Sequence, residues 1–137
     1  MNFINSIQIL LIICWTLLSA IVAAIGLLVS KNCSFWIAKN FWAKIICKIV
    51  RCKVDMTGLE NIKSLDKPAI FCANHLSTFD IIAIYTAIDR PIYFIAKKEL
   101  QNVPFLGWYM QLSGMIFIDR SNKEKAISSM RDAGKMI

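Results

Sequence analysis

The chain has 137 residues, enough for at most one domain of ordinary size, and its 57% hydrophobic content is high for a soluble protein. Its net charge of +7 is concentrated, because residues 1–30 carry no charge, residues 31–53 carry six basic side chains and no acid, and residues 54–137 are nearly balanced. This distribution predicts contact with anionic membrane lipids and argues against a nucleic-acid partner, since no basic and aromatic stripe recurs in the later part.

Residues 9–29 form an uncharged segment long enough to cross a bilayer core of about 30 Å as a helix. A membrane-embedded helix is the leading interpretation. The alternatives are a cleaved signal peptide, disfavoured by the missing basic start, and a buried soluble helix, disfavoured by length. Basic residues follow the segment and none precede it, so the positive-inside rule predicts that everything after Lys31 lies in the cytoplasm.

Residues 34–51 predict a second helix that is amphipathic and basic. At 100° per residue, Lys44, Lys48 and Arg51 fall in one arc, while an aromatic and aliphatic arc lies opposite. We expect this helix to lie in the head-group layer, the alternative being an ordinary surface helix packed on a core. Lys39 lies on the apolar side and is expected to snorkel towards water. Residues 1–53 are thus predicted to be a membrane-associated two-helix segment.

From residue 54 onwards the pattern changes to short apolar runs that alternate with helical patterns, which favours an α/β domain with parallel pairing over residues 54–137. Strands are predicted at 53–56, 68–73, 91–96 and 115–118, and a further strand after Gly134. Helices are predicted at 78–88 and 121–133, with a short one through 107–109. The five cysteines have no metal-ligand spacing, so we expect free thiols in a reducing compartment and no metal site.

The only histidine, His75, follows the apolar run 68–73 and precedes Asp80 by five residues. On one continuous helix the two side chains would point about 140° apart, so they meet only across a turn. Ser77 to Asp80 reads as a capping box that supplies this turn. The pair can act as a general base with an orienting acid, or His75 can be structural and Asp80 a helix cap.

Two later strand ends carry cations. Lys97 and Lys98 follow one, and Arg120 follows the other. A proton acceptor together with cations at the mouth of an α/β sheet suits a substrate with a reactive hydroxyl and an anionic group such as phosphate. Taken singly, these residues are ordinary surface charges.

Three motifs occur in order. The first is N-H-x-x-x-x-D, with Asn74, His75 and Asp80. The second is K-x-x-L-x-x-x-P-x-x-G, with Lys97, Leu100, Pro104 and Gly107, and the third is F-x-x-R, with Phe117 and Arg120. Over about residues 50–137 the chain resembles the glycerolipid acyltransferases, most closely those that act on 1-acylglycerol-3-phosphate.

The resemblance implies transfer of a fatty acyl group from acyl-CoA or acyl-carrier protein, as co-substrate, to the free hydroxyl of lysophosphatidic acid, without a cofactor. His75 would be the general base and Asp80 its orienting partner. The substrate site would include Lys97 and Arg120 on the phosphate, Pro104 and Gly107 in the loop beside it, and Asn74, Ser77 and Phe117.

The family also carries an E-G-T-R motif on a strand that would begin where this sequence ends. We therefore expect an acyltransferase domain that is incomplete at its C-terminus and weak or inactive by itself. Three alternatives remain open at this stage: an acyltransferase for another lysolipid, a non-catalytic membrane adaptor, and a basic membrane-binding module.

Overall fold

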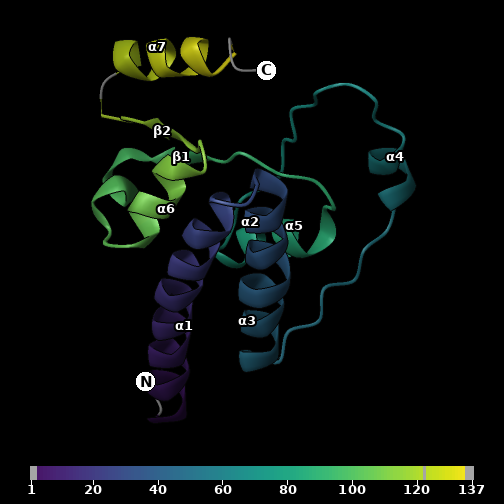
Figure 1. Ribbon diagram of the computed structural model, residues 1–137, viewed down its shortest axis with the longest axis vertical. Helices are drawn as coiled ribbons and strands as arrows, with labels where there is room; N and C mark the ends of the chain where they lie inside the picture. Colours follow the sequence, from purple (N-terminus) through teal and green to yellow (C-terminus); the bar gives the residue numbers. More distant parts are fainter. Residues whose placement is uncertain (1–2, 122, 135–137) are drawn as a thin grey trace.

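The computed structural model describes residues 3–121 and 123–134. Its N-terminal part is a pair of long helices that run side by side (Figure 1). The first is α1 (Phe3–Leu27), and the second is continuous through α2 (Lys31–Ile37), a π-helical segment η1 (Ala38–Ala43) and α3 (Lys44–Ile49). The helix predicted at 9–29 therefore starts six residues earlier than expected.

The turn between the two helices follows from local chemistry. Ser30 has extended backbone angles, and its hydroxyl accepts a hydrogen bond from the Cys33 backbone N–H at 3.0 Å, as an N-cap does. Gly26 allows the helices to approach closely, since a Cβ there would lie 2.7 Å from the Ile37 side chain and 3.2 Å from the Ser34 backbone. Small residues thus set the close contact between α1 and α2.

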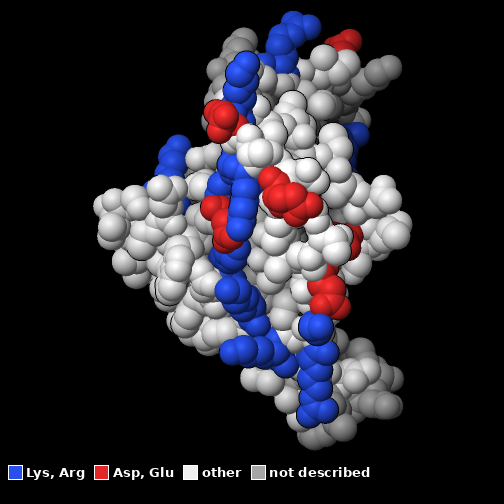
Figure 2. All heavy atoms as spheres, turned by 90° about the vertical axis from the view of Figure 1, so that its right-hand side faces the viewer, with Lys and Arg blue, Asp and Glu red and all other residues white. Residues whose placement is uncertain are grey.

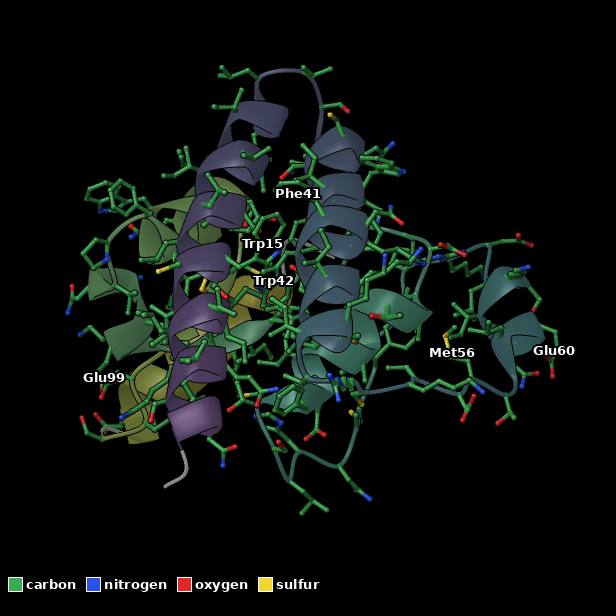
Figure 3. The ribbon with its side chains drawn as sticks, turned by 90° about the horizontal axis from the view of Figure 1, so that it is seen from below. Trp15, Phe41, Trp42, Met56, Glu60 and Glu99 are labelled. Carbon is green, nitrogen blue, oxygen red and sulfur yellow. The ribbon has the colours of Figure 1, made fainter. Side chains whose placement is uncertain are left out.

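Aromatic side chains fill the space between the long helices and the later part of the chain. The Trp15 and Phe41 ring centroids are 4.5 Å apart, and the Trp42 indole N–H donates to Thr16 at 3.1 Å (Figure 3). The buried Tyr85 of α5 (Phe79–Ala87) contacts Trp42 edge to face at 5.4 Å and stacks on Phe35. The apolar arc of the second helix therefore packs on protein, as the surface-helix alternative predicts.

Lys39 does not snorkel as expected. Only 8% of the residue is exposed, and its ammonium donates to the Ile88 carbonyl at 3.2 Å and pairs with the Asp89 carboxylate. This contact lowers the pKa of Asp89, chiefly through the hydrogen bond from Lys39. Lys39 thus lies on the apolar face of its helix but pairs with groups at the C-terminal end of α5, where free carbonyls favour positive charge.

The later part of the chain is mostly helical, with one small sheet. Strands β1 and β2 pair in parallel with Ala96 opposite Phe117, and the connection between them passes through η2 and α6, which packs on α1. The remaining elements are α4 (Leu59–Lys63), β1 (Ile95–Lys97), the 3₁₀ helix η2 (Lys98–Asn102), α6 (Leu106–Leu112), β2 (Ile116–Ile118) and α7 (Lys123–Gly134).

Two predicted strands are wrong. Residues 53–56 and 68–73 are irregular and mostly exposed, and 91–96 and 115–118 shorten to β1 and β2. A strand is stable only with a hydrogen-bonded neighbour, and neither absent run pairs with the β1–β2 sheet. The α/β class is therefore not confirmed: the described residues are mostly helical with a parallel pair. The strand predicted after Gly134 lies outside the described residues.

Charged side chains gather on one face. Figure 2 shows Lys and Arg in a long stripe down the side of the molecule, with acidic side chains lying against it and beside it. The second helix and the turn after it contribute exposed Lys44, Lys48, Arg51 and Lys53, as the charge pattern predicts. The five cysteines are free thiols.

Candidate functional site

His75 and Asp80 meet across the turn that begins α5, as the spacing predicts. The His75 Nδ1 lies 3.1 Å from the Asp80 Oδ2, and the two side chains are 63% and 31% exposed. The same Oδ2 accepts hydrogen bonds from the backbone N–H groups of Leu76 and Ser77, both at 2.8 Å. One carboxylate oxygen therefore holds the turn together and also contacts the imidazole.

The predicted capping box is present in a shifted form. Asp80 reaches back to the Ser77 N–H as expected, but the Ser77 hydroxyl accepts from the N–H of Phe79 at 3.2 Å, and α5 begins at Phe79. The pKa of Asp80 is lowered, first by the hydrogen bond from the Ser77 backbone and then by those from His75 and Leu76. The carboxylate is therefore held ionised.

This geometry defines which imidazole nitrogen is available. An ionised carboxylate only accepts hydrogen bonds, so Nδ1 of the neutral His75 ring carries the hydrogen and donates a hydrogen bond to Asp80. The Nε2 lone pair then faces away from the contact and makes no hydrogen bond within the described residues. An exposed imidazole oriented in this way can take a proton from a substrate hydroxyl.

The titration of Asp80 tests this arrangement. We expect the chemical shift of the Asp80 carboxyl carbon to report a pKa below the ordinary value of 3.8. His75→Ala should raise this pKa only in part, because the hydrogen bond from Ser77 stabilises the carboxylate most. Since the folded pKa is depressed, this stabilisation is present above pH 3.8 and is lost as pH falls through the folded midpoint. Carbon-detected NMR measures both midpoints, with Asp89 as an internal control that His75→Ala leaves unchanged.

The parallel pairing brings the cationic strand ends to one edge of the sheet. Lys97, the last residue of β1, lies in register with Ile118 at the end of β2. Lys97 pairs with Glu99 at 3.1 Å, and Lys98 pairs with Asp119 at 3.3 Å. Arg120 is exposed and has no ion pair within the part of the chain that the structure describes. Two cations already have acidic partners, and Arg120 is left available.

The loop residues of the second motif have a clear structural role. Pro104 accepts a hydrogen bond from the Leu106 N–H at 2.7 Å across Phe105, which has φ 62° and ψ −53° and thus forms a strained γ-turn. A Cβ on Gly107 would lie 2.5 Å from the Leu100 carbonyl oxygen and closer still to that of Gln101. Glycine is therefore required where α6 lies against η2.

The remaining predicted residues are divided between two places. Asn74 is exposed in the irregular segment before α5, and Phe117 is half-buried in β2. Among the described residues, no hydrogen bond or ion pair links the His75–Asp80 pair with Lys97 or Arg120. The strand predicted at 68–73, which was expected to bring His75 to the sheet edge, is absent. The structure thus assembles the two halves of the candidate site separately.

The sequence interpretation missed the acidic partners of the cations. Glu99, Asp119 and Asp89 each hold a lysine, and only the apolar position of Lys39 signalled that such a partner was needed. It also missed Arg90, whose guanidinium donates to the carbonyls of Leu65 and Ile62 and so attaches the C-terminal end of α4 and the residues after it to the region following α5. Within the described residues, no three His, Cys, Asp or Glu side chains group to hold a metal ion.

Comparison with known proteins shows the family of the chain. The family model described as Acyltransferase matches residues 53–137. The chain is 38% identical over 95 residues to a protein of Saccharomyces cerevisiae named 1-acyl-sn-glycerol-3-phosphate acyltransferase, a match covering 69% of this chain and 31% of that protein. A Helicobacter pylori protein of the same name is 37% identical over 115 residues, covering 82% of this chain and 48% of its own length.

A chloroplastic protein of Arabidopsis thaliana with this name is 29% identical over 79 residues, or 58% of this chain and 22% of the relative. The matches thus span less than half the length of each of these three relatives. No solved structure matches the chain.

Proposed function

Because the chain belongs to the acyltransferase family, we propose that the protein containing it transfers a fatty acyl group to the free hydroxyl of 1-acylglycerol-3-phosphate. The observation that carries this proposal is the 3.1 Å contact between His75 Nδ1 and Asp80 Oδ2, which leaves Nε2 available as a base. The names of the similar yeast and bacterial proteins support the acceptor.

The proposed reaction is direct transfer. Nε2 of His75 takes the proton of the acceptor hydroxyl while that oxygen attacks the thioester carbonyl, so the new C–O bond forms as the C–S bond breaks. The thiolate leaving group then takes the proton from the imidazolium. Asp80 stabilises the imidazolium between these two transfers, and no acyl-enzyme is needed. The donor is a thioester of coenzyme A or of acyl-carrier protein.

The acceptor phosphate is proposed to bind at the β1–β2 edge. Arg120 offers a planar donor set suited to phosphate oxygens, and Lys97 lies on the neighbouring strand end, where phosphate competes with Glu99 for its ammonium. For His75 to reach the same substrate, the segment before α5 must move to this edge. We propose that it does so within an α/β domain formed over residues 54–137, with Asn74, Ser77, Pro104, Gly107 and Phe117 around the acceptor.

Membrane association is the third part of the proposal. One described helix, Asn5–Leu27, is long and apolar enough to cross a membrane, a test that a signal sequence also passes. The exposed basic face of the second helix suits anionic head groups. We propose that residues 1–53 attach the domain to a membrane on its cytoplasmic side, where the lipid acceptor resides.

The phosphate site can be tested by charge removal. We expect Lys97→Gln and Arg120→Gln in the complete gene product to raise KM for lysophosphatidic acid by about 10–100-fold each, the effect of losing one charge-assisted hydrogen bond of about 1.5–3 kcal/mol. KM for an uncharged monoacylglycerol should change little. The measurement is acyl transfer with each acceptor and with both donor classes.

Lys63→Gln is the matched control, because Lys63 is an exposed lysine of α4, outside both the proposed phosphate site and the proposed membrane segment. Equal KM changes for the charged and the uncharged acceptor would contradict a phosphate-binding role. Preference for a different lysolipid over lysophosphatidic acid would replace the proposed acceptor.

A further inference from the structure

The segment between the two cationic strand ends has an unusual surface. Residues 100–118 contain no charged side chain, yet only four of these residues are buried. Four of its large apolar side chains are exposed by 36–68%: Leu100, Phe105, Trp108 and Leu112. A charge-free run with exposed aromatic residues indicates a surface that meets something other than water.

Helix α6 has two distinct faces. Its inner face carries Tyr109, which is 8% exposed and packs with Ala20 and Ala23 of α1. Its outer face carries Trp108 and Leu112, one helical turn apart and 56% and 68% exposed. The inner face accounts for the packing of α6, so the core does not need the outer pair.

The turn before α6 directs another aromatic residue to the same surface. Phe105 occupies the strained γ-turn with positive φ, its side chain is 42% exposed, and its ring meets that of Trp108 edge to face at 5.2 Å. Aromatic residues rarely adopt this backbone conformation. The strained backbone of Phe105 holds its ring on the surface and not in the core, which indicates that the ring contacts something outside the chain.

Helix α6 packs directly on α1, and α1 also has exposed apolar side chains. Leu11, Leu18, Ile21 and Ile25 of α1 are exposed and lie at helical spacing, and the exposed Leu28 follows the helix. Exposed lysines lie next to these elements in the chain: Lys31 follows the turn after α1, Lys97 precedes η2, and Lys98 is the first residue of η2. Exposed apolar residues that include a Trp, with lysines nearby in the chain, are typical of a membrane interface.

We propose that Phe105, Trp108 and Leu112 insert into the interfacial layer of the same bilayer that α1 contacts, forming a second membrane contact within the acyltransferase domain. The inference rests on the proposed membrane association of α1. Such insertion would also position the cationic strand end. Because η2 follows Lys97 directly and leads into α6, insertion of α6 holds Lys97 at the level of the lipid phosphates. The acceptor can then reach the site without leaving the membrane.

Lipid quenching of Trp108 fluorescence tests the contact. The 137-residue chain is reconstituted in phosphatidylcholine–phosphatidylglycerol vesicles whose acyl chains carry bromine either near the carbonyl end or near the methyl end. The difference between wild type and Trp108→Phe isolates the Trp108 emission, since Phe keeps an aromatic ring there. We expect this component to be quenched by bromine near the carbonyl end and protected from iodide in the water.

Leu112→Glu is expected to abolish the lipid quenching of Trp108, and the exposed position of Leu112 allows the variant to fold. Ile70→Glu is the matched control, because Ile70 is a 76% exposed apolar residue in the irregular segment between α4 and α5, and it should have no effect. Trp108 emission that is quenched by iodide alone contradicts the proposal. Shielding from both quenchers also contradicts it, since a protein partner, such as a second copy of the chain, would then cover α6.

The outcome separates this inference from the proposed function. The remaining tryptophans are Trp15 of α1 and Trp36 and Trp42 of the second helix. Lipid quenching of these residues, with Trp108 open to iodide, means that the N-terminal helices bind the bilayer and α6 does not. Absence of lipid quenching from every tryptophan overturns the proposed membrane association as well.

Discussion

Gly107→Ala is expected to lower the free energy of unfolding by about 3 kcal/mol. This is the upper end of the roughly 1–3 kcal/mol typical of overpacking, because the opposing atoms are backbone. A Cβ at this position would meet the carbonyls of Leu100 and Gln101, which belong to η2 and cannot rotate away as a side chain can. The variant must separate α6 from η2 or distort both. Chemical denaturation of wild type and variant measures the loss.

Gly134→Ala is the matched control. Gly134 ends α7, and a Cβ there would meet no heavy atom within 4 Å. The same substitution should therefore change the free energy of unfolding by less than about 0.5 kcal/mol. Equal stability of the two variants would show that the close approach of α6 to η2 does not exist in the folded protein.

His75→Ala is expected to lower kcat for acyl transfer by about 10²–10⁴-fold, the usual contribution of a general base. Binding should change less, because the phosphate and the acyl chain contact other residues. Asp80→Asn should give a smaller loss, since Asn can still accept a hydrogen bond from the Ser77 N–H but cannot stabilise the imidazolium. Saturating both substrates in the complete gene product isolates kcat.

Local sequence patterns predicted the structure well where short-range chemistry decides it. The Ser77–Asp80 turn joins His75 to its acid because the donors and the acceptor lie within five residues of one another. The apolar stretch forms α1, and the cationic ends of β1 and β2 lie at one edge because parallel pairing fixes their register.

Long-range partners decided what the sequence could not. Residues 68–73 have the composition of a strand, but a strand also needs a neighbour, which no local pattern supplies. Lys39 looked like a snorkelling lysine because its partner, Asp89, lies 50 residues away. Gly107 matched a motif expected to shape a substrate loop, and its visible role is to let two backbones touch.

The central claim is that His75 is the base for acylation of lysophosphatidic acid. The most direct test measures phosphatidic acid formed from lysophosphatidic acid and a thioester donor by the complete gene product carrying wild type, His75→Ala or Leu76→Ala. Leu76 is 94% exposed and contacts Asp80 only through its backbone N–H, so Leu76→Ala keeps the turn and should retain wild-type turnover. We predict a loss of at least about 100-fold for His75→Ala alone; undiminished turnover by that variant would contradict the account.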